Sequence, residues 1–72
     1  CPWNPDLWFL CGLIYERGKR FKHAFDAYYR AHRLGSEQAR AKLRLFVRHD
    51  ELQARLGSGQ KQILKRFEDV LT

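Results

Sequence analysis

The sequence contains no apolar stretch long enough to cross a lipid bilayer. Its longest run without a charged or strongly polar side chain is LWFLCGLIY, residues 7–15, whereas a transmembrane helix needs about 20 consecutive apolar residues. No basic segment precedes this run, as one would in a signal peptide. We therefore expect no membrane-spanning helix, and no targeting segment is visible.

Methionine is absent and cysteine is scarce. Because residue 1 is a cysteine rather than a methionine, we expect the chain to be a processed or trimmed piece of a longer protein, and a lipid-anchored N-terminal cysteine stays open. Two cysteines are too few for a disulfide scaffold. Cys11 lies in the apolar run, where we expect a buried reduced thiol; a Cys1–Cys11 disulfide is the alternative. This pattern favours a reducing, intracellular compartment without identifying it.

Acidic residues are few relative to basic ones. The sequence has 14 Lys and Arg against 8 Asp and Glu, a formal charge of +6. Such a balance favours acidic proteins, nucleic acids or anionic membrane surfaces as partners; a solvated basic surface is the alternative. We expect one domain, residues 1–72. A chain this short buries roughly 60% of the surface that it exposes when unfolded.

Capping residues and glycines divide the chain into helices. Asn4 is a good N-cap and Pro5 suits the first helical position, so a helix is predicted to begin there and to end at Gly18. Gly35 and Ser36 are the stop of a second helix and the N-cap of a third. The predicted helices span approximately residues 5–17 and 19 or 20–34, then a third from about residue 37, and a last one over residues 60–71.

The second half of the chain contains two interruptions. His49-Asp50 is predicted to break or bend the third helix, because Asp50 with Gln53 three residues on resembles a capping box. Gly57-Ser58-Gly59 is predicted to be a turn before the last helix. Two glycines and a lysine in LGSGQK suggest a phosphate-binding loop, but the full spacing and a preceding strand are missing.

Apolar residues recur at three- and four-residue steps within the predicted helices. The second helix has the face Phe21, Ala24, Phe25, Tyr28, Ala31 and Leu34. The third has Ala39, Leu43, Phe46 and Val47, and the last has Ile63, Leu64, Phe67, Val70 and Leu71. Residues 39–45 alternate like a strand, but their residue types are strong helix formers. The sequence therefore predicts an all-α fold of about four helices, paired antiparallel through short connections.

The first two predicted helices carry the spacing of a known repeat: Trp8, Cys11, Gly12 and Tyr15, then Gly18, Phe21, Ala24, Tyr28 and Ala31. The pattern resembles the tetratricopeptide repeat, a helix–turn–helix unit. The join AYYRAHRLGSEQARAKL is similar to Sel1-like repeats, and the half-a-TPR class is a weaker match. The resemblance covers roughly residues 5–47. It implies a short α-solenoid, in which residues 5–35 form the first hairpin and residues 36–72 a degenerate second repeat or capping helices.

This resemblance assigns packing roles. Gly12 and Ala24 are small where the two helices approach closely. Trp8, Tyr15 and Tyr28 are large where the space opens, and Ala31 is small where the next helix presses in. In such a stack the first helix of each pair is the inner one, with Trp8, Cys11, Gly12 and Tyr15 facing the second helix.

Another flank of the first helix carries Leu7, Leu10 and Ile14, which need separate cover. The third and fourth helices are expected to supply part of it. A preceding repeat or a second copy of the chain would supply the rest. Left exposed, each such side chain forgoes roughly 1.5–3 kcal/mol.

Nothing in the sequence predicts catalysis, a cofactor or a metal ion. The histidines, His23, His32 and His49, do not combine with Cys1 and Cys11 in a known zinc spacing. His32 borders the apolar face, where a satisfied core histidine is the expected role. We therefore expect no enzyme activity from this chain.

Several residues are candidates for partner binding. Arg40, Arg44 and Arg48 are four apart and form one edge of the third helix; an acidic partner or plain solvation would offset their repulsion. Trp3 and Phe9 are candidates for anchors that insert into a neighbour. A further basic cluster surrounds the first turn: Arg17, Lys19, Arg20 and Lys22.

The sequence thus predicts a protein-interaction module, a repeat segment of a scaffold or adaptor. Its partner would be another protein, which is acidic if the basic residues bind it. A neighbouring repeat or a second copy of the chain is the alternative. The alternative is a nucleic-acid-binding helical domain that uses the Arg40, Arg44 and Arg48 edge, with a steep salt dependence. A helical appendage of an enzyme is a third option.

Overall fold

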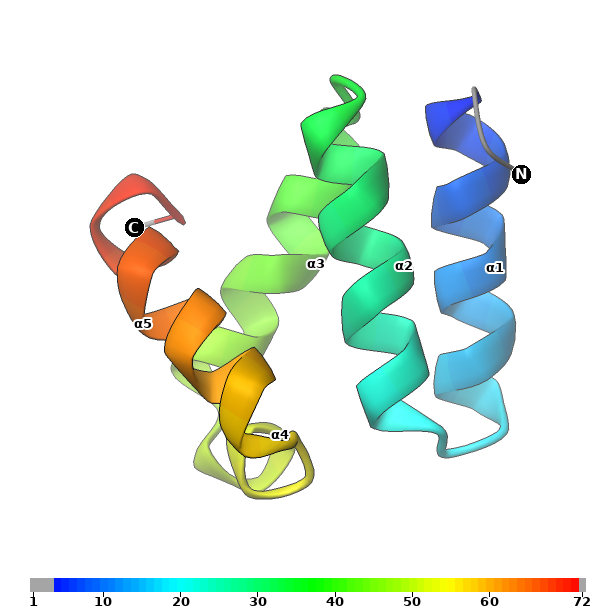
Figure 1. Cartoon of the computed structure of the whole chain (residues 1–72). Coiled ribbons are helices and arrows are strands. Elements are labelled where there is room, and N and C mark those ends of the chain that lie inside the picture. Colours follow the sequence, from blue (N-terminus) through cyan, green and yellow to red (C-terminus); the bar gives the residue numbers. More distant parts are fainter. Residues whose placement is uncertain (1–3, 72) are drawn as a thin grey trace.

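Five helices make up the chain in the computed structural model, which describes residues 4–71 and the side chains of residues 4–66 (Figure 1). They are α1 (Pro5–Arg17), α2 (Phe21–Arg33), α3 (Glu37–Arg48), α4 (Asp50–Ala54) and α5 (Ser58–Leu71). The described residues contain no strand. The predicted all-α class is confirmed, with one more helix than expected because the break at His49 separates the short α4. The stacked-solenoid arrangement stays a prediction.

The predicted helix starts are confirmed by capping contacts. Asn4 accepts a hydrogen bond from the backbone N–H of Asp6 at 2.9 Å, and Ser36 accepts one from the N–H of Ala39 at 3.2 Å. Each satisfies a donor that has no partner within the helix. After α2, Gly35 has a φ of 105°, a left-handed conformation that glycine adopts without a steric cost.

The predicted capping box at Asp50 is wrong. His49, in an extended conformation, is the N-cap of α4 and forms no side-chain cap. Gln53 instead donates from Nε2 to the carbonyl of Val47 at 2.7 Å, which satisfies the C-terminal end of α3. The last helix begins at Ser58, two residues before the predicted start, and Gln60 Oε1 accepts from the N–H of Gly57 at 2.8 Å. LGSGQK is therefore a helix stop followed by a helix start.

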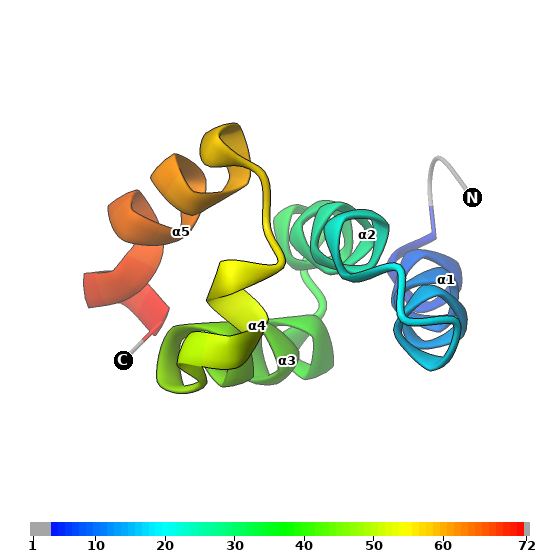
Figure 2. The ribbon, with the colours of Figure 1, turned by 90° about the horizontal axis from the view of Figure 1, so that it is seen from below.

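Helix α2 lies at the centre of the arrangement, with α1 on one side and α3 on the other (Figures 1 and 2). Helices α1, α2 and α3 alternate in direction along the chain (Figure 1), as predicted for successive helices. Helix α5 packs against α3 and reaches the beginning of α2, where Gln60 Nε2 donates to the carbonyl of Lys22 at 2.7 Å. That bond joins residues far apart in the sequence and fixes the start of α5.

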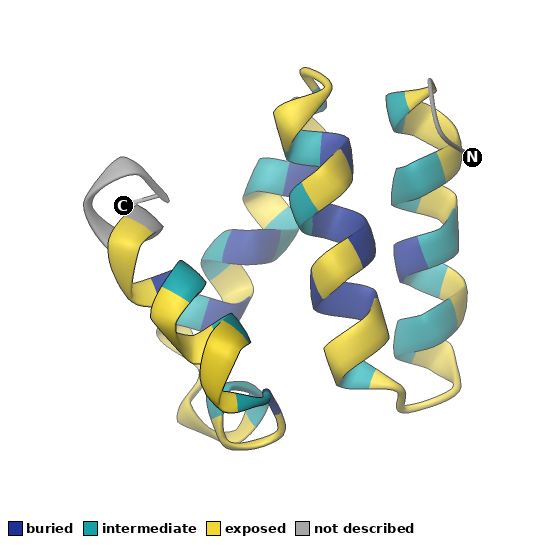
Figure 3. Ribbon diagram, in the orientation of Figure 1, coloured by how far each residue is buried: buried dark blue, intermediate teal, exposed yellow. Residues whose placement is uncertain are grey.

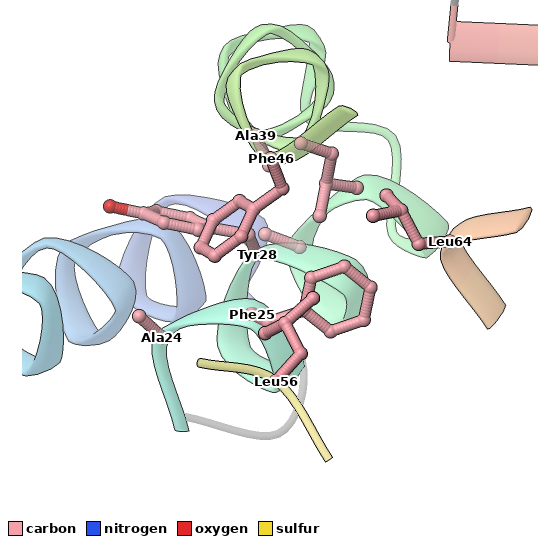
Figure 4. Close-up of a cluster of buried hydrophobic side chains, with 9 residues drawn as sticks. Ala24, Phe25, Tyr28, Ala39, Phe46, Leu56 and Leu64 are labelled. Atoms are coloured by element: carbon pink, nitrogen blue, oxygen red, sulfur yellow. The ribbon is translucent and has the colours of Figure 1, made fainter. Parts of the chain in front are cut away.

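The core lies between α2 and α3. Phe46 of α3 meets Phe25 edge-on at 5.5 Å between ring centroids and Tyr28 at 6.4 Å (Figure 4). All three side chains are buried, together with Ala24, Ala27, Ala31, Ala39, Leu43, Leu56 and Leu64. The first helix contributes Gly12 as its buried residue. The prediction that the first helix is the inner one is therefore wrong: α2 occupies that position, because both its neighbours pack on it.

Candidate functional site

The side of α1 that faces α2 is the predicted one. Arg30 lies over the ring of Trp8 at 5.3 Å, and the rings of Tyr15 and His23 are 5.2 Å apart. Because residue numbers fall along α2 as they rise along α1, these contacts also establish the antiparallel pairing. Cys11 lies beside them on α1 and is half-buried, rather than buried as predicted.

Gly12 approaches α2 closely, and the side chain nearest to it is that of Tyr28. A Cβ at Gly12 would lie 2.6 Å from Cδ1 of Tyr28, so the ring rather than Ala24 fills this space. Tyr28 was expected where the space between the helices opens; it is instead fully buried and packed against Gly12. A large ring fits there because Gly12 has no side chain.

Tyr28 also contacts two further residues of α1. Its hydroxyl donates to Glu16 Oε2 at 3.4 Å, and burial, followed by the charge of Glu16, raises the pKa of the Tyr28 phenol. The ring of Phe9 lies 5.7 Å from that of Tyr28. Phe9 is half-buried against the chain's own core, so we exclude it from the docking surface proposed below. Trp3, the other predicted anchor, lies outside the described residues.

Another flank of α1, turned away from α2, presents three aliphatic side chains to solvent. Leu7 is 46% exposed, Leu10 50% and Ile14 61%. Their spacing of three and four residues places them on one helix face, and we refer to them as the α1 stripe. Figure 3 shows the exposed residues of α1 on the side turned away from α2. The expectation that the third and fourth helices help to cover this flank is wrong, because α2 separates α1 from them.

The α1 stripe differs from an ordinary exposed leucine. Singly exposed apolar residues are common on protein surfaces, and Leu45 on α3, 38% exposed, is an example. Contiguous apolar patches more often mark binding sites. Each of the three side chains would contribute roughly 1.5–3 kcal/mol if a partner buried it fully. Since about half of each is already covered, the stripe offers about half of that amount per residue.

A shallow depression lies between α1 and the end of α2. Its volume is about 240 Å³, and it is lined by Trp8, Arg30, Arg33 and Leu34. Both arginines lie against aromatic rings: Arg30 over Trp8, and Arg33 over Tyr29 at 5.8 Å. Trp and Arg side chains are enriched among residues that dominate protein interfaces.

Charged residues bound the stripe at its two ends. Asp6 and Arg17 are both exposed. Asp6 and Arg17 are 11 positions apart in the sequence. At 3.6 residues per turn, this spacing places them on nearly the same flank of the helix. Beyond Arg17, the basic cluster of the first turn continues through Lys19, Arg20 and Lys22, all exposed. The stripe is thus neutral along its length, acidic at one end and basic at the other.

The predicted arginine edge is only partly solvent-facing. Arg40 and Arg44 are half-buried and Arg48 is exposed. Arg40 and Arg44 line a depression of about 260 Å³ that also contains Glu37 and Ala41. An acidic side chain in this depression reduces its attraction for phosphate. Burial, and then the charges of Arg40 and Arg33, lower the pKa of nearby His32, which fits its predicted place at the border of the core.

No group of His, Cys, Asp and Glu that could hold a metal ion occurs within the described part of the chain. In the same part, no helix has the length and apolar character required to span a membrane.

Comparison of the chain with protein-family models, with curated proteins and with solved structures finds no match. The likeness to tetratricopeptide and Sel1-like repeats therefore depends on the residue spacing alone.

Proposed function

We propose that this chain is a protein–protein interaction module that binds its partner through the α1 stripe and has no catalytic activity of its own. The observation that carries the proposal is the exposure of Leu7, Leu10 and Ile14, between 46% and 61%, on one face of a helix that packs against α2 on its other side. A scaffold or adaptor segment of the tetratricopeptide or Sel1-like kind presents helix faces in this way.

The chemistry of the stripe favours a protein partner over a nucleic acid. Nucleic-acid affinity comes largely from Lys and Arg contacts to phosphates, and the stripe carries no charge over two helical turns. Aliphatic side chains at steps of three and four form ridges that fit the grooves of another helix. The arginine edge is the weaker candidate surface, because Glu37 shares the depression of Arg40 and Arg44.

The basic cluster after the stripe adds a preference for acidic residues at the rim of the partner. Arg17, Lys19 and Arg20 are exposed at the end of α1. Charges at a rim change the association rate and its salt dependence more than they change the affinity. We therefore expect the aliphatic contacts to determine whether binding occurs and the basic cluster to orient it.

We expect Leu10→Lys to abolish partner binding while the fold is retained. An ammonium group in an apolar contact loses hydration without a compensating partner. Loss of the leucine contact, about half of the 1.5–3 kcal/mol of a fully buried side chain, by itself weakens binding by roughly 3- to 12-fold. The measurement is chemical crosslinking and co-purification of the tagged chain from cells that express it naturally, with circular dichroism melting of the purified variant.

The matched control is Leu45→Lys, which makes the same exchange at an exposed leucine of α3 outside the stripe. It should retain the partner that the unmodified chain captures. If Leu10→Lys retained that partner, or if Leu45→Lys lost it equally, the stripe would not be the docking surface.

A further inference from the structure

We propose that the partner on the α1 stripe is a second copy of this chain, with the two α1 helices packed antiparallel about a twofold axis. This inference rests on the proposed function and names the partner of the same site. Three properties of α1 support it: the charges at the ends of the stripe, the position of the basic cluster, and the symmetry of the stripe itself.

The end charges make the stripe complementary to itself in one orientation. Asp6 precedes Leu7, and Arg17 follows Ile14. Asp6 and Arg17 lie on nearly the same flank of α1. A twofold axis perpendicular to the helices keeps that flank on the same side in both copies. Antiparallel packing therefore places Asp6 of each copy near Arg17 of the other, which gives two opposite-charge contacts. Parallel packing would bring the two Asp6 residues to one end of the pair and the two Arg17 residues to the other, so neither opposite-charge contact would form.

The basic cluster also favours the antiparallel orientation. Each copy carries a formal charge of +6, and Arg17, Lys19, Arg20 and Lys22 are gathered at one end of α1. In a parallel pair the two clusters would lie side by side and repel. In an antiparallel pair they lie at opposite ends, and each is next to the acidic end of the other copy's stripe.

The stripe is symmetric enough for a twofold interface, in which the same patch serves both copies. With the axis near its middle, Leu7 of one copy meets Ile14 of the other, and Leu10 lies near the axis. Cys11, which follows Leu10, lies between the stripe and the side of α1 that faces α2, on the flank away from Asp6 and Arg17. The two thiols therefore lie on the same edge of the interface, near its axis. One face of a helix with 13 residues can bury only a small interface area. We therefore expect a reversible dimer that forms at high protein concentration.

Sedimentation equilibrium of two charge variants and their mixture tests this arrangement. Asp6→Lys and Arg17→Asp each create two like-charge contacts in an antiparallel dimer, and each alone should weaken dimerisation about tenfold. An equimolar mixture should recover the dimer, because in the mixed pair both contacts again join opposite charges. A variant that had merely misfolded would not be rescued by mixing.

Crosslinking of Cys11 provides a second readout. In a Cys1→Ser background, a short bismaleimide should join two chains through Cys11. The matched control removes both native cysteines and adds Leu45→Cys; it should give little dimer at the same concentration.

The outcomes separate this inference from the proposed function. A chain that stays monomeric up to about 1 mM, the range of the weakest specific complexes, overturns self-pairing. So does a mixture that dimerises no better than the single variants. In either case the interaction module would still be supported if the chain captured a different protein, and if that capture were lost with Leu10→Lys and retained with Leu45→Lys. Recovery of the dimer on mixing supports both.

Discussion

Phe46→Ala is expected to lower the free energy of unfolding by about 3–5 kcal/mol. Phe46 is 1% exposed and meets the rings of both Phe25 and Tyr28, so it is the contact that joins α3 to α2. The domain has only on the order of 5–10 kcal/mol to lose, because a chain of this size buries a small core. The variant should therefore be at the edge of unfolding at room temperature.

Urea denaturation followed by far-ultraviolet circular dichroism measures this effect. With a slope near 1 kcal/mol per molar urea, the midpoint should fall by roughly 3 M or more. The control is Phe46→Leu, which keeps most of the volume and should cost less than about 1.5 kcal/mol. A midpoint for Phe46→Ala close to that of the unmodified chain would show that the α2–α3 contact is not the centre of the core.

Gly12→Ala is expected to destabilise the chain by about 1–3 kcal/mol, although alanine is the better helix former. A Cβ at this position would lie 2.6 Å from Tyr28 Cδ1, and the Tyr28 ring is itself packed against Phe46. Either α1 moves away from α2 or the ring moves into the core, and both lose packing. The same denaturation measurement applies.

Gly59→Ala is the matched control for this prediction. Gly59 lies within α5, and a Cβ there meets no atom within 4 Å. The exchange should therefore leave stability unchanged or raise it by up to about 1 kcal/mol. A lower free energy of unfolding for Gly12→Ala, with an unchanged or higher one for Gly59→Ala, would support the close approach of α1 to Tyr28. If both variants were stabilised equally, the close approach of α1 to Tyr28 would be contradicted.

Local signals in the sequence predicted the helices well. Asn4 and Ser36 cap the helices they were expected to cap, because an N-cap bond involves residues only two or three positions apart. The break at His49 and the end of α2 before Gly35 follow from similarly local chemistry. The error at Gln53 shows the limit. A capping box requires the side-chain oxygen of Gln53 to accept from a backbone N–H, but Gln53 instead donates from Nε2 to the carbonyl of Val47.

Tertiary neighbours were harder to predict. The apolar run at residues 7–15 indicates that much of α1 avoids water, but not which element covers it. The sequence pattern is equally consistent with an inner helix and with an edge helix that has an unoccupied docking face. The bond from Gln60 to the carbonyl of Lys22 has no sequence signal at all, since any exposed glutamine near a helix start looks the same.

Among the candidate site residues, the structure distinguishes anchors from core. Phe9 and Leu10 are adjacent in the sequence and equally apolar, yet Phe9 packs on Tyr28 whereas Leu10 is half exposed. The helical step separates them by 100°, and only the position of α2 determines which one remains available. The stripe of Leu7, Leu10 and Ile14 could be recognised from sequence as one face, but its exposure could not.

The most direct test of the docking surface is photo-crosslinking from within the stripe. A photoreactive phenylalanine derivative is placed at position 10 of the full chain, and in a second protein at position 45, in cells that express the chain naturally. We predict a discrete crosslinked species, containing either a second copy or another protein, from position 10 and none from position 45. If position 10 gave no such species, or the two positions gave the same one, α1 would not present a docking face.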